Sequence, residues 1–560
     1  MTQSNSRRKF IRNFSLGTVA VATIALAGCG GDSSHRSVSF AHGVASGDPL
    51  ADRVILWTRV TAAGTGDIDV AWEVAEDSAF TRTVASGITS TGGARDFTVK
   101  VDATGLAANR SYYYRFGCEG AVSPVGRTKT LPTGAVSRVR FAVFSCSNYP
   151  AGYFNVYADA AKFDDIDVGL HLGDYIYEYA AGGYASQNAA SMGRVSQPAN
   201  EIITLSDYRL RYQQYRTDPD LQAVHARIPF ITVWDDHELA NDAWRDGAEN
   251  HTPETEGLWT GRRQMAIQAY YEWMPIRQLD PARPDRIYRS FDFGNLLSLH
   301  MLDTRVIGRD KQLAHAAYAG ADGSFNGAAF MADVSDPARQ LLGQEQTAWL
   351  QGQMSRSTAT WQVLGQQVLM ARMLLPAPMV LDATGYMAYF AIAAKLQAGV
   401  ALTAAEQQQL AATPVPYNLD AWDGYQAARE TVLNMARTLN KNLVVLAGDT
   451  HNAWASDLLD AGGRAVGVEF GVPSVTSPGF EVYFPTVAPA TLGGGLEQLI
   501  GPLQYAETAS RGFVVLTVTP TDTRAEYRYV NTVTSKTYTA SVRKTLRTLP
   551  GPGNRKIVAV

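Results

Sequence analysis

At 560 residues, 46% of them hydrophobic and 18% charged, the chain is long and apolar enough to bury the cores of two or more domains, and global disorder is excluded. The formal net charge is -4, whereas nucleic-acid-binding domains carry a basic footprint, so we expect no stable binding to nucleic acid. Three cysteines are too few for a disulfide scaffold.

Residues 1–29 resemble an export signal that ends in a lipid-attachment site. Residues 6–11 match a twin-arginine pattern, and the uncharged stretch 14–28 is shorter than the roughly 20 apolar residues that span a bilayer. The stretch runs into a lipobox-like sequence in which cleavage leaves Cys29 as the lipid-bearing N-terminus. We therefore predict export by the twin-arginine route to the periplasm or cell surface. There the protein would be anchored to the membrane through lipid on Cys29, with residues 30–37 as a polar tether. An uncleaved anchor or a chance basic tail is the alternative.

Short alternating strands fill residues 38–133. Strands of this kind, separated by Gly, Asp and Thr turns, are typical of an immunoglobulin-like or fibronectin-like β-sandwich, which we predict as the N-terminal domain. The clearest strands are 54–60, 69–75, 97–102 and 111–116.

From residue 138 the pattern changes to strongly apolar runs that alternate with helical segments, which predicts an α/β domain over 134–545. Residues 376–416 are predicted as an inserted helical excursion, and 546–560 as a C-terminal tail. The apolar runs are 139–145, 168–172, 228–234, 296–302, 361–364 and 443–447, and the helices are expected at 206–220 and 421–439.

Five of these runs end directly at polar residues that can bind metal or phosphate. Ligands in open α/β sheets bind beyond the carboxyl ends of the strands, so we expect these residues to gather at one site. They are Cys146, Asp174 with Tyr177, Asp236 with His237, Asp303 with Arg305, and Asp449 with His451.

Each candidate also has a structural interpretation. Cys146 could pair with Cys118 or fill the core, Tyr177 could cap the core, and Arg305 could be a surface charge instead of a group that recognises phosphoryl oxygens. Asp236 could cap a helix. In favour of a metal site, a carboxylate and a phenolate suit Fe(III) better than Zn(II), and nine histidines in the whole chain disfavour an all-imidazole zinc site.

Taken together, the motifs resemble those of the alkaline phosphatase D (PhoD)-like family, a branch of the calcineurin-like metallophosphoesterases. The resemblance spans nearly the whole chain after residue 38 and implies a metallophosphoesterase-type β-sandwich flanked by helices, an α/β fold preceded by the N-terminal sandwich. The matching stretches are 40–48, 56–59, 144–149, 173–179, 204–211, 234–238, 302–305, 423–425 and 448–451.

The resemblance further implies a site that holds Fe3+ and Ca2+. Asp174 would bridge the two ions, and the all-oxygen set on the second side suits Ca2+. The implied iron ligands are Cys146, Tyr177 and His451, and the implied calcium ligands are Asp236, Asp449 and, as an additional ligand, Asn452.

The expected activity is hydrolysis of phosphate mono- or diesters by a metal-activated hydroxide, as in an alkaline phosphatase or phosphodiesterase. Arg305 is expected to hold the phosphoryl group, and His237 to act as the acid for the leaving oxygen. Two alternatives stay open: a zinc- or manganese-dependent nuclease or phosphodiesterase on the same scaffold, and a lipid-anchored protein that binds a surface polymer and has a degenerate catalytic domain. The sequence does not distinguish monoesters from diesters as the substrate, and it does not indicate an oligomeric state.

Overall fold

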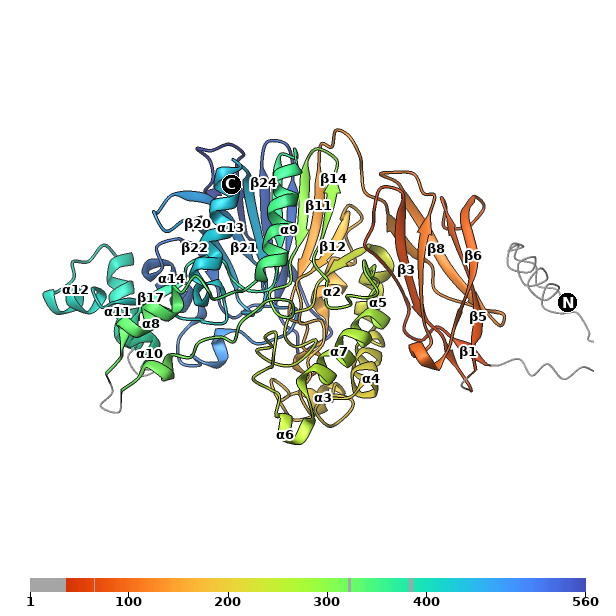
Figure 1. Ribbon diagram of the computed structural model, residues 1–560, viewed down its shortest axis with the longest axis horizontal. Helices are drawn as coiled ribbons and strands as arrows, with labels where there is room; N and C mark the ends of the chain where they lie inside the picture. Colours follow the sequence, from red (N-terminus) through yellow and green to blue (C-terminus); the bar gives the residue numbers. More distant parts are fainter. Residues whose placement is uncertain (1–36, 65, 321–323, 382–385) are drawn as a thin grey trace, which may run out of the picture.

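Figure 1 shows the computed structural model, which describes residues 37–64, 66–320, 324–381 and 386–560. The predicted export signal at 1–29 and most of the tether lie outside the described residues. Among the helices that are described, none has the length and apolar character needed to cross a bilayer.

Two large sheets pack face to face and share one apolar core, to which Phe141, Leu170, Leu299 and Val444 contribute. The first sheet has ten strands, in the spatial order β26 (Val558–Ala559), β25 (Ala540–Thr548), β24 (Thr523–Val530), β23 (Gly512–Val518), β11 (Val139–Phe144), β12 (Val168–His171), β13 (Phe230–Thr232), β2 (Val44–Gly47), β3 (Arg53–Arg59) and β7 (Thr98–Thr104). The second has seven, in the order β14 (Arg289–Phe293), β15 (Leu297–Met301), β16 (Trp361–Gly365), β19 (Asn442–Ala447), β21 (Ala465–Gly471), β20 (Ala453–Leu459) and β22 (Leu503–Glu507).

The central strands of both sheets are parallel, which places their carboxyl ends together. In the ten-stranded sheet β11, β12 and β13 run in parallel, and in the seven-stranded sheet β15, β16, β19 and β21 do. Each of the six apolar runs predicted in this domain forms a strand, although β13 covers only three residues of the run at 228–234. The arrangement confirms the predicted β-sandwich with flanking helices.

Helices cover the outer face of each sheet (Figure 1). On α13 (Gln426–Thr438) the buried residues Arg429, Val432, Leu433 and Ala436 follow the i, i+3, i+4, i+7 spacing of a helix with one face in the core. It covers the seven-stranded sheet together with α9 (Gly343–Arg356) and α14 (Pro489–Leu499). The ten-stranded sheet is covered by α2 (Asn155–Ala160), α4 (Leu205–Arg216), α5 (Pro219–Arg227) and α7 (Trp259–Trp273).

The single helix predicted at 206–220 is wrong, because the chain forms two. α4 begins with a capping box between Thr204 and Asp207 and ends at Arg216. The Asp218 carboxylate then accepts from the backbone N–H groups of Asp220 and Leu221, and Pro219 occupies the first turn of α5. The helix expected from residue 421 begins at Gln426, after the 3-10 turn η4 (Trp422–Gly424).

The N-terminal domain is a β-sandwich, as predicted, but one of its sheets continues into the α/β domain. Its separate sheet has the order β10 (Gly126–Lys129), β8 (Ser111–Cys118), β5 (Ile68–Ala75) and β6 (Thr83–Thr91), with β9 (Ala121–Val122) paired to β8. The facing strands β2, β3 and β7 extend the ten-stranded sheet, where Gly47 is paired with Phe230. A Cβ at Gly47 would lie 2.1 Å from the Pro275 carbonyl oxygen, so this close junction requires glycine.

The excursion predicted at 376–416 is helical and stands on a short two-stranded neck. The strands β17 (Leu374–Pro376) and β18 (Pro414–Pro416) pair at its base. The helices α10 (Ala377–Leu381), α11 (Tyr386–Gln397) and α12 (Ala404–Leu410) lie between them. α11 packs against α14, and the whole excursion projects from the body of the molecule (Figure 1).

The C-terminal segment differs from the predicted tail at 546–560. Strand β25 continues to Thr548, and β26 pairs with it at the edge of the ten-stranded sheet. The Ile557 backbone N–H also donates to the Asp457 carboxylate at 2.8 Å. These contacts hold the segment against the domain.

Candidate metal centre

The predicted metal ligands lie in loops at the carboxyl ends of β11, β12, β13 and β19, where the two sheets meet. Four of them, Cys146, Asp174, Asp449 and His451, have left-handed backbone with φ of 61°, 56°, 65° and 62°. This conformation costs on the order of 1 kcal/mol for each non-glycine residue and concentrates at functional sites. The loops therefore accept local strain that aims these side chains into one region.

Gly173 brings two of these loops together. Its φ is 113°, and an added Cβ would lie 2.3 Å from the Asp235 Cβ and 2.5 Å from the Asp235 backbone nitrogen. Only glycine permits this approach between the ends of β12 and β13. The contact brings Asp174 and Asp236, one residue further along each loop, into the same cluster.

The first group of donors consists of Cys146, Asp174, Tyr177 and His451. Ligand atoms of Cys146, Asp174 and His451 all lie within 4.8 Å of one another. The Tyr177 hydroxyl lies 3.1 Å from Asp174 Oδ2 and 3.2 Å from His451 Nε2, so the phenol joins the same group. Cys146 and Cys118 are both buried and are not joined in a disulfide, which excludes the disulfide alternative.

The His451 ring is oriented by its other nitrogen. Nδ1 lies 2.9 Å from the Pro478 carbonyl oxygen, to which it donates, and 3.1 Å from the Tyr184 hydroxyl. This arrangement leaves Nε2 directed at the Tyr177 hydroxyl with a free lone pair. Burial lowers the pKa of His451 to about 3, so the imidazole is neutral, which is the form that binds metal.

Cys146 and Tyr177 are held in their protonated forms by the protein alone. Burial raises the pKa of both groups well above their ordinary values, and the nearby Asp174 carboxylate adds to the rise. A cation in contact with a thiol or phenol reverses this by displacing the proton. Binding of metal at this group therefore requires the release of protons.

Carboxylates form two further groups beside the first. Asp174 with Asp236 and His237, and Asp236 with Asp235 and Asp449, each place their ligand atoms within 4.8 Å of one another. Three buried oxygens, Asp174 Oδ1, Asp235 Oδ2 and Asp236 Oδ1, accept no hydrogen bond among the described residues, although Asp236 Oδ1 lies 3.7 Å from Arg305 Nη2. Unpaired buried carboxylate oxygens are costly, and a hard divalent or trivalent cation would satisfy them. The donor set thus fits the metal pair that the sequence predicts.

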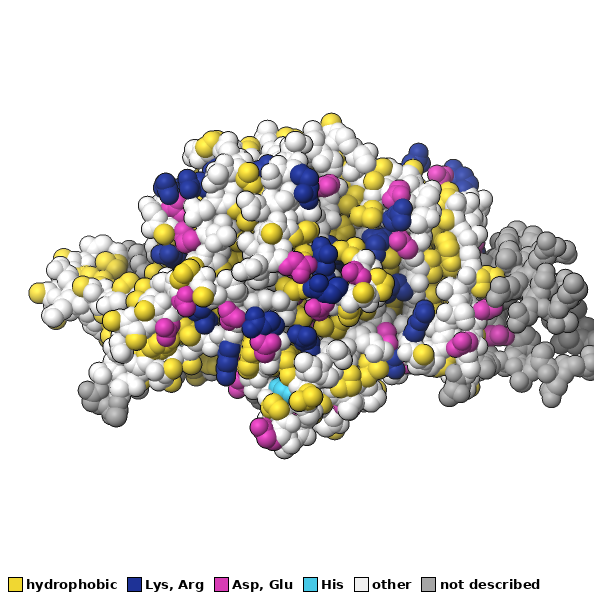
Figure 2. All heavy atoms as spheres, in the orientation of Figure 1, with side chains coloured by type: hydrophobic (Ala, Val, Ile, Leu, Met, Phe, Trp, Pro, Cys, Tyr) yellow, Lys and Arg dark blue, Asp and Glu magenta, His cyan; other side chains and the backbone are white. Residues whose placement is uncertain are grey.

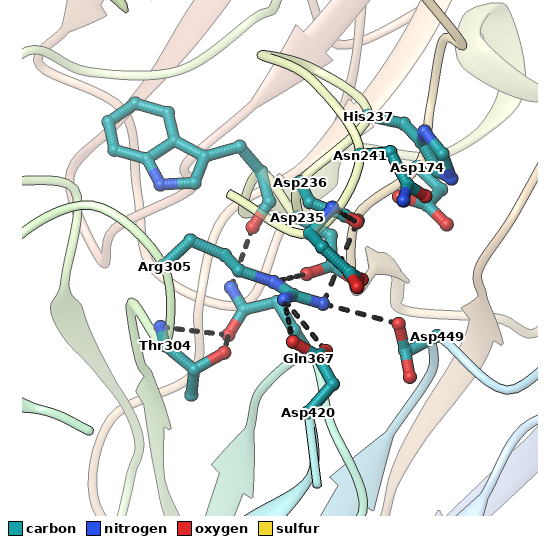
Figure 3. A network of polar contacts seen from close by, with 12 residues as sticks. Asp174, Asp235, Asp236, His237, Asn241, Thr304, Arg305, Gln367, Asp420 and Asp449 are labelled. Carbon is teal, nitrogen blue, oxygen red and sulfur yellow. Dashed lines mark hydrogen bonds and ion pairs between the residues drawn. The ribbon is translucent and has the colours of Figure 1, made fainter. Parts of the chain in front are cut away.

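Arg305 lies at the centre of the carboxylates and contacts several of them at once (Figure 3). Its side chain is fully buried; Nε lies 2.5 Å from Asp235 Oδ1, and Nη2 lies 3.2 Å from Asp449 Oδ1. Nη1 donates to the Asp420 carboxylate at 2.9 Å. This placement differs from the expectation that Arg305 faces a phosphoryl group: the guanidinium fork, which matches carboxylate and phosphate equally, is engaged by carboxylates.

His237 is fixed against Glu178 and Tyr177. Its Nδ1 lies 2.7 Å from Glu178 Oε2, and its ring stacks on Tyr177 with the centroids 4.2 Å apart. Burial alone would lower the pKa of His237, but Asp236, Glu178 and Asp174 raise it well above its ordinary value. The hydrogen bond at Nδ1 leaves Nε2 as the nitrogen that can exchange a proton with a substrate.

Two acidic residues near the site act on the backbone. Glu238 accepts from the N–H groups of Asp174, Tyr175 and Asp235 at 3.0, 2.6 and 2.8 Å, which ties the ends of β12 and β13 together. Asp303, whose role the sequence left open, accepts from the N–H groups of Arg305 and the two residues that follow it. Both therefore shape the loops that carry the donors.

Asn452 is buried with its amide satisfied by backbone. Its Nδ2 donates to the Thr450 carbonyl at 2.6 Å, and its Oδ1 accepts from the Phe480 N–H at 3.0 Å. These bonds account for its burial without a cation. The predicted additional ligand thus braces the loop that carries Asp449 and His451.

Several residues that complete the site were not assigned a role from the sequence. Glu178 and Glu238 directly follow predicted donors, so a second carboxylate beside each was a usable signal. Tyr184 lies in the loop seven residues after Tyr177, whereas Asp420 and Ser477 lie in loops much later in the chain, and no periodicity marks any of the three. Ser477 Oγ lies 2.6 Å from the Tyr177 hydroxyl.

Comparisons with known proteins agree with this geometry. The family model for PhoD-like phosphatases matches residues 141–527, and the model for their N-terminal domain matches residues 25–132. Alkaline phosphatase D of Bacillus subtilis (strain 168) is 36% identical over 565 residues, which cover 96% of this chain and 86% of that protein. A solved structure of PhoD superposes with a TM-score of 0.76 at 35% identity, covering 95% of this chain and 93% of that one.

We predict that Arg305→Met lowers the free energy of unfolding by about 3–5 kcal/mol, because it leaves buried carboxylates without their counter-charge. Urea denaturation with matched metal content measures the change. As a control, Arg283→Met removes an arginine whose side chain is 44% exposed, and should cost less than about 1 kcal/mol. A stable Arg305→Met variant that loses only substrate affinity would instead favour direct contact with the phosphoryl group.

Proposed function

Because this chain belongs to the PhoD-like phosphatase family and is a phosphoric ester hydrolase, we propose that it hydrolyses phosphate mono- or diesters outside the cytoplasm at a centre of two kinds of metal ion. The observation that carries the proposal is the convergence of a thiol, a phenol, an imidazole and carboxylates with unpaired buried oxygens. Bound cations would stabilise this set, since each buried carboxylate oxygen without a hydrogen-bond partner carries a desolvation cost.

The first ion is proposed to be Fe3+, held by Cys146, Asp174, Tyr177 and His451. A phenolate and a carboxylate are hard anionic donors that favour a trivalent ion, and a strongly charged ion can displace the protons that burial holds on Cys146 and Tyr177. The neutral imidazole of His451 completes the set through Nε2.

The second ion is proposed to be Ca2+, held by Asp236 and Asp449 and shared with the first through Asp174. The carboxylates of Asp174, Asp236 and Asp449 are the anionic donors on this side, beside the His237 ring, and oxygen donors suit a hard divalent ion better than zinc. Asn452 is left out of the proposed set because its amide is already bonded to backbone. When bound, the two ions would supply Lewis-acid activation of water and would offset the charge on the phosphoryl oxygens.

The residues of the chain have separate tasks in the proposed reaction. Glu178 holds a proton on His237 Nδ1, and Nε2 delivers the proton that the departing alkoxide needs. Stacking on Tyr177 fixes the direction in which Nε2 points. Arg305 keeps Asp235 and Asp449 in position and reduces their mutual repulsion, so it acts on substrate only through the carboxylates.

Export and anchoring are part of the proposal and rest on the sequence. The twin-arginine pattern and the lipobox-like sequence before Cys29 support a periplasmic or cell-surface lipoprotein. The retained donors argue against a degenerate domain that only binds a surface polymer.

Iron content is expected to depend on Cys146 and not on Cys118. We predict that Cys146→Ala lowers bound iron by at least about tenfold and abolishes hydrolysis of p-nitrophenyl phosphate, because the variant loses one of four donors. Elemental analysis after purification without added metal measures both ions. Cys118 is also a buried thiol outside any disulfide but lies in the N-terminal domain, so Cys118→Ala should keep iron and activity. Zinc or manganese in place of iron in the wild-type protein would contradict the assignment.

His237 should matter most for poor leaving groups. We predict that His237→Gln lowers kcat for alkyl phosphoesters by about 10²–10⁴-fold and for p-nitrophenyl esters much less, because nitrophenolate leaves without a proton. Metal content should stay at the wild-type level. His251→Gln changes a histidine outside the site and serves as the control. Equal losses for both classes of leaving group would remove the proton-donor role.

Lipid attachment is expected to require Cys29. We predict that Cys29→Ser in the full chain abolishes incorporation of radiolabelled fatty acid and releases active protein into the soluble extracytoplasmic fraction. Fractionation with an activity assay measures the result. Labelled, membrane-bound Cys29→Ser protein would show that the anchor lies elsewhere.

A further inference from the structure

An apolar cavity of about 570 Å³ lies between the helical excursion and α14. Its walls come from α10, α11 and α14, from Tyr417 beyond the neck, and from the segment that contains Phe480 and Phe484. Among the described residues that line it, none carries a charge. A cavity of this size and lining is typical of a site for a small apolar ligand.

The cavity shares its walls with the loops of the metal centre. Phe480 lines it and donates its backbone N–H to Asn452 at 3.0 Å, two residues after Pro478, which holds the His451 ring. Trp454 lines it and donates to the Thr450 hydroxyl at 2.8 Å, directly between Asp449 and His451. The same loops thus line the apolar cavity and carry the metal donors.

The mouth of the cavity opens beside the metal centre. Tyr483 lines the cavity and is 67% exposed, so the cavity reaches solvent at this residue. Tyr483 belongs to the segment that follows Pro478, whose carbonyl oxygen accepts from the Tyr184 hydroxyl at 3.4 Å. Tyr184 in turn contacts His451 Nδ1 at 3.1 Å. The rim of the cavity at Tyr483 therefore belongs to the segment that holds the His451 ring through Pro478.

The surroundings of the mouth are also apolar. Val482 and Met387 are 49% and 54% exposed, and hydrophobic side chains cover much of the excursion in Figure 2. Exposed apolar groups that gather around an opening mark a binding site more often than a neutral surface.

We propose that this cavity binds the alkyl or acyl chain of an amphiphilic phosphoester while the phosphoryl group lies at the metal centre. The inference rests on the proposed function and adds the class of substrate. A sugar or nucleoside would leave its polar groups unpaired in this lining, whereas an alkyl chain loses only its contact with water. Binding energy from the chain positions the reacting ester, so it contributes to kcat/KM.

The test is a series of p-nitrophenyl alkyl phosphodiesters with methyl, butyl, hexyl and octyl chains, each assayed below its critical micelle concentration. With the wild-type holoenzyme, kcat/KM is expected to rise roughly two- to fourfold for each added methylene. A rise of this kind requires an apolar site that receives the chain, because the reacting bonds are the same in every ester.

Two substitutions assign the effect to this cavity. Val380→Trp fills the cavity from α10 and should flatten the series, whereas Val84→Trp is the same substitution at an exposed valine of β6 in the N-terminal domain and should leave the slope unchanged. Tyr483→Gln replaces an exposed side chain at the mouth, so it carries little risk of misfolding, and it should also lower the octyl-to-methyl ratio. Thermal melting verifies that each variant is folded.

The outcomes separate this inference from the proposed function. Hydrolysis of the methyl ester with no dependence on chain length would overturn the inference and leave the proposed function intact. Failure to hydrolyse any ester would count against the proposed function itself. A chain-length slope that both Val380→Trp and Tyr483→Gln retain would place the apolar site elsewhere and overturn the inference. So would wild-type dimers, detected by light scattering, that Val380→Trp dissociates, because a second copy would then occupy this face.

Discussion

The structure depends on how negative charge is compensated in a buried region where two sheets meet. Asp174, Asp235 and Asp236 lie together with Asp420 and Asp449, and effective penalties for burying an ion run to several kcal/mol. The protein offsets part of this cost with the guanidinium of Arg305 (Figure 3) and with backbone N–H groups. Three carboxylate oxygens are still unpaired among the described residues. Burial raises the pKa of Asp174 and Asp235, so the protein alone favours their protonation, and a bound cation would satisfy these oxygens in the ionised form.

The sandwich solves the problem of bringing donors together from distant parts of the chain. Parallel strands from both sheets end at one edge, so residues as far apart as Cys146 and His451 share a site. The strands fix where each loop begins, and left-handed residues then turn the side chains inward. Gly173 and Glu238 hold two of these loops at the required separation. The strain of these loops is tolerated because the apolar core beneath them is continuous between the sheets.

Much of this arrangement can be predicted from the sequence, because the signals are local. Apolar runs identify the strands, and donors that directly follow the runs identify the site. The contacts of Arg305 cannot be predicted in this way, since a guanidinium suits phosphate and carboxylate alike and its partner Asp420 comes from a segment with no periodic signal. The sheet junction at Gly47 cannot be predicted from local sequence either, because it depends on tertiary contacts with residues distant in the chain. By contrast, the helix break at Asp218 carries a capping aspartate followed by proline, a signal that predicts two helices in place of one.

The excursion shows how chemistry and substrate choice can reside in different parts of one chain. Its helices stand on the β17–β18 neck between β16 and β19 and pack against α14, away from the shared core of the sheets. Substitutions in α10 or α11 would therefore reshape the apolar cavity without moving the strands that carry Cys146, Asp174 or Asp449. The wall formed by Trp454 and Phe480 is different, because it is bonded to the loop of His451 and is constrained by the metal centre. One side of the cavity is thus tied to the chemistry and the other is free to vary, which is the arrangement that lets a fixed hydrolytic centre accept new phosphoesters.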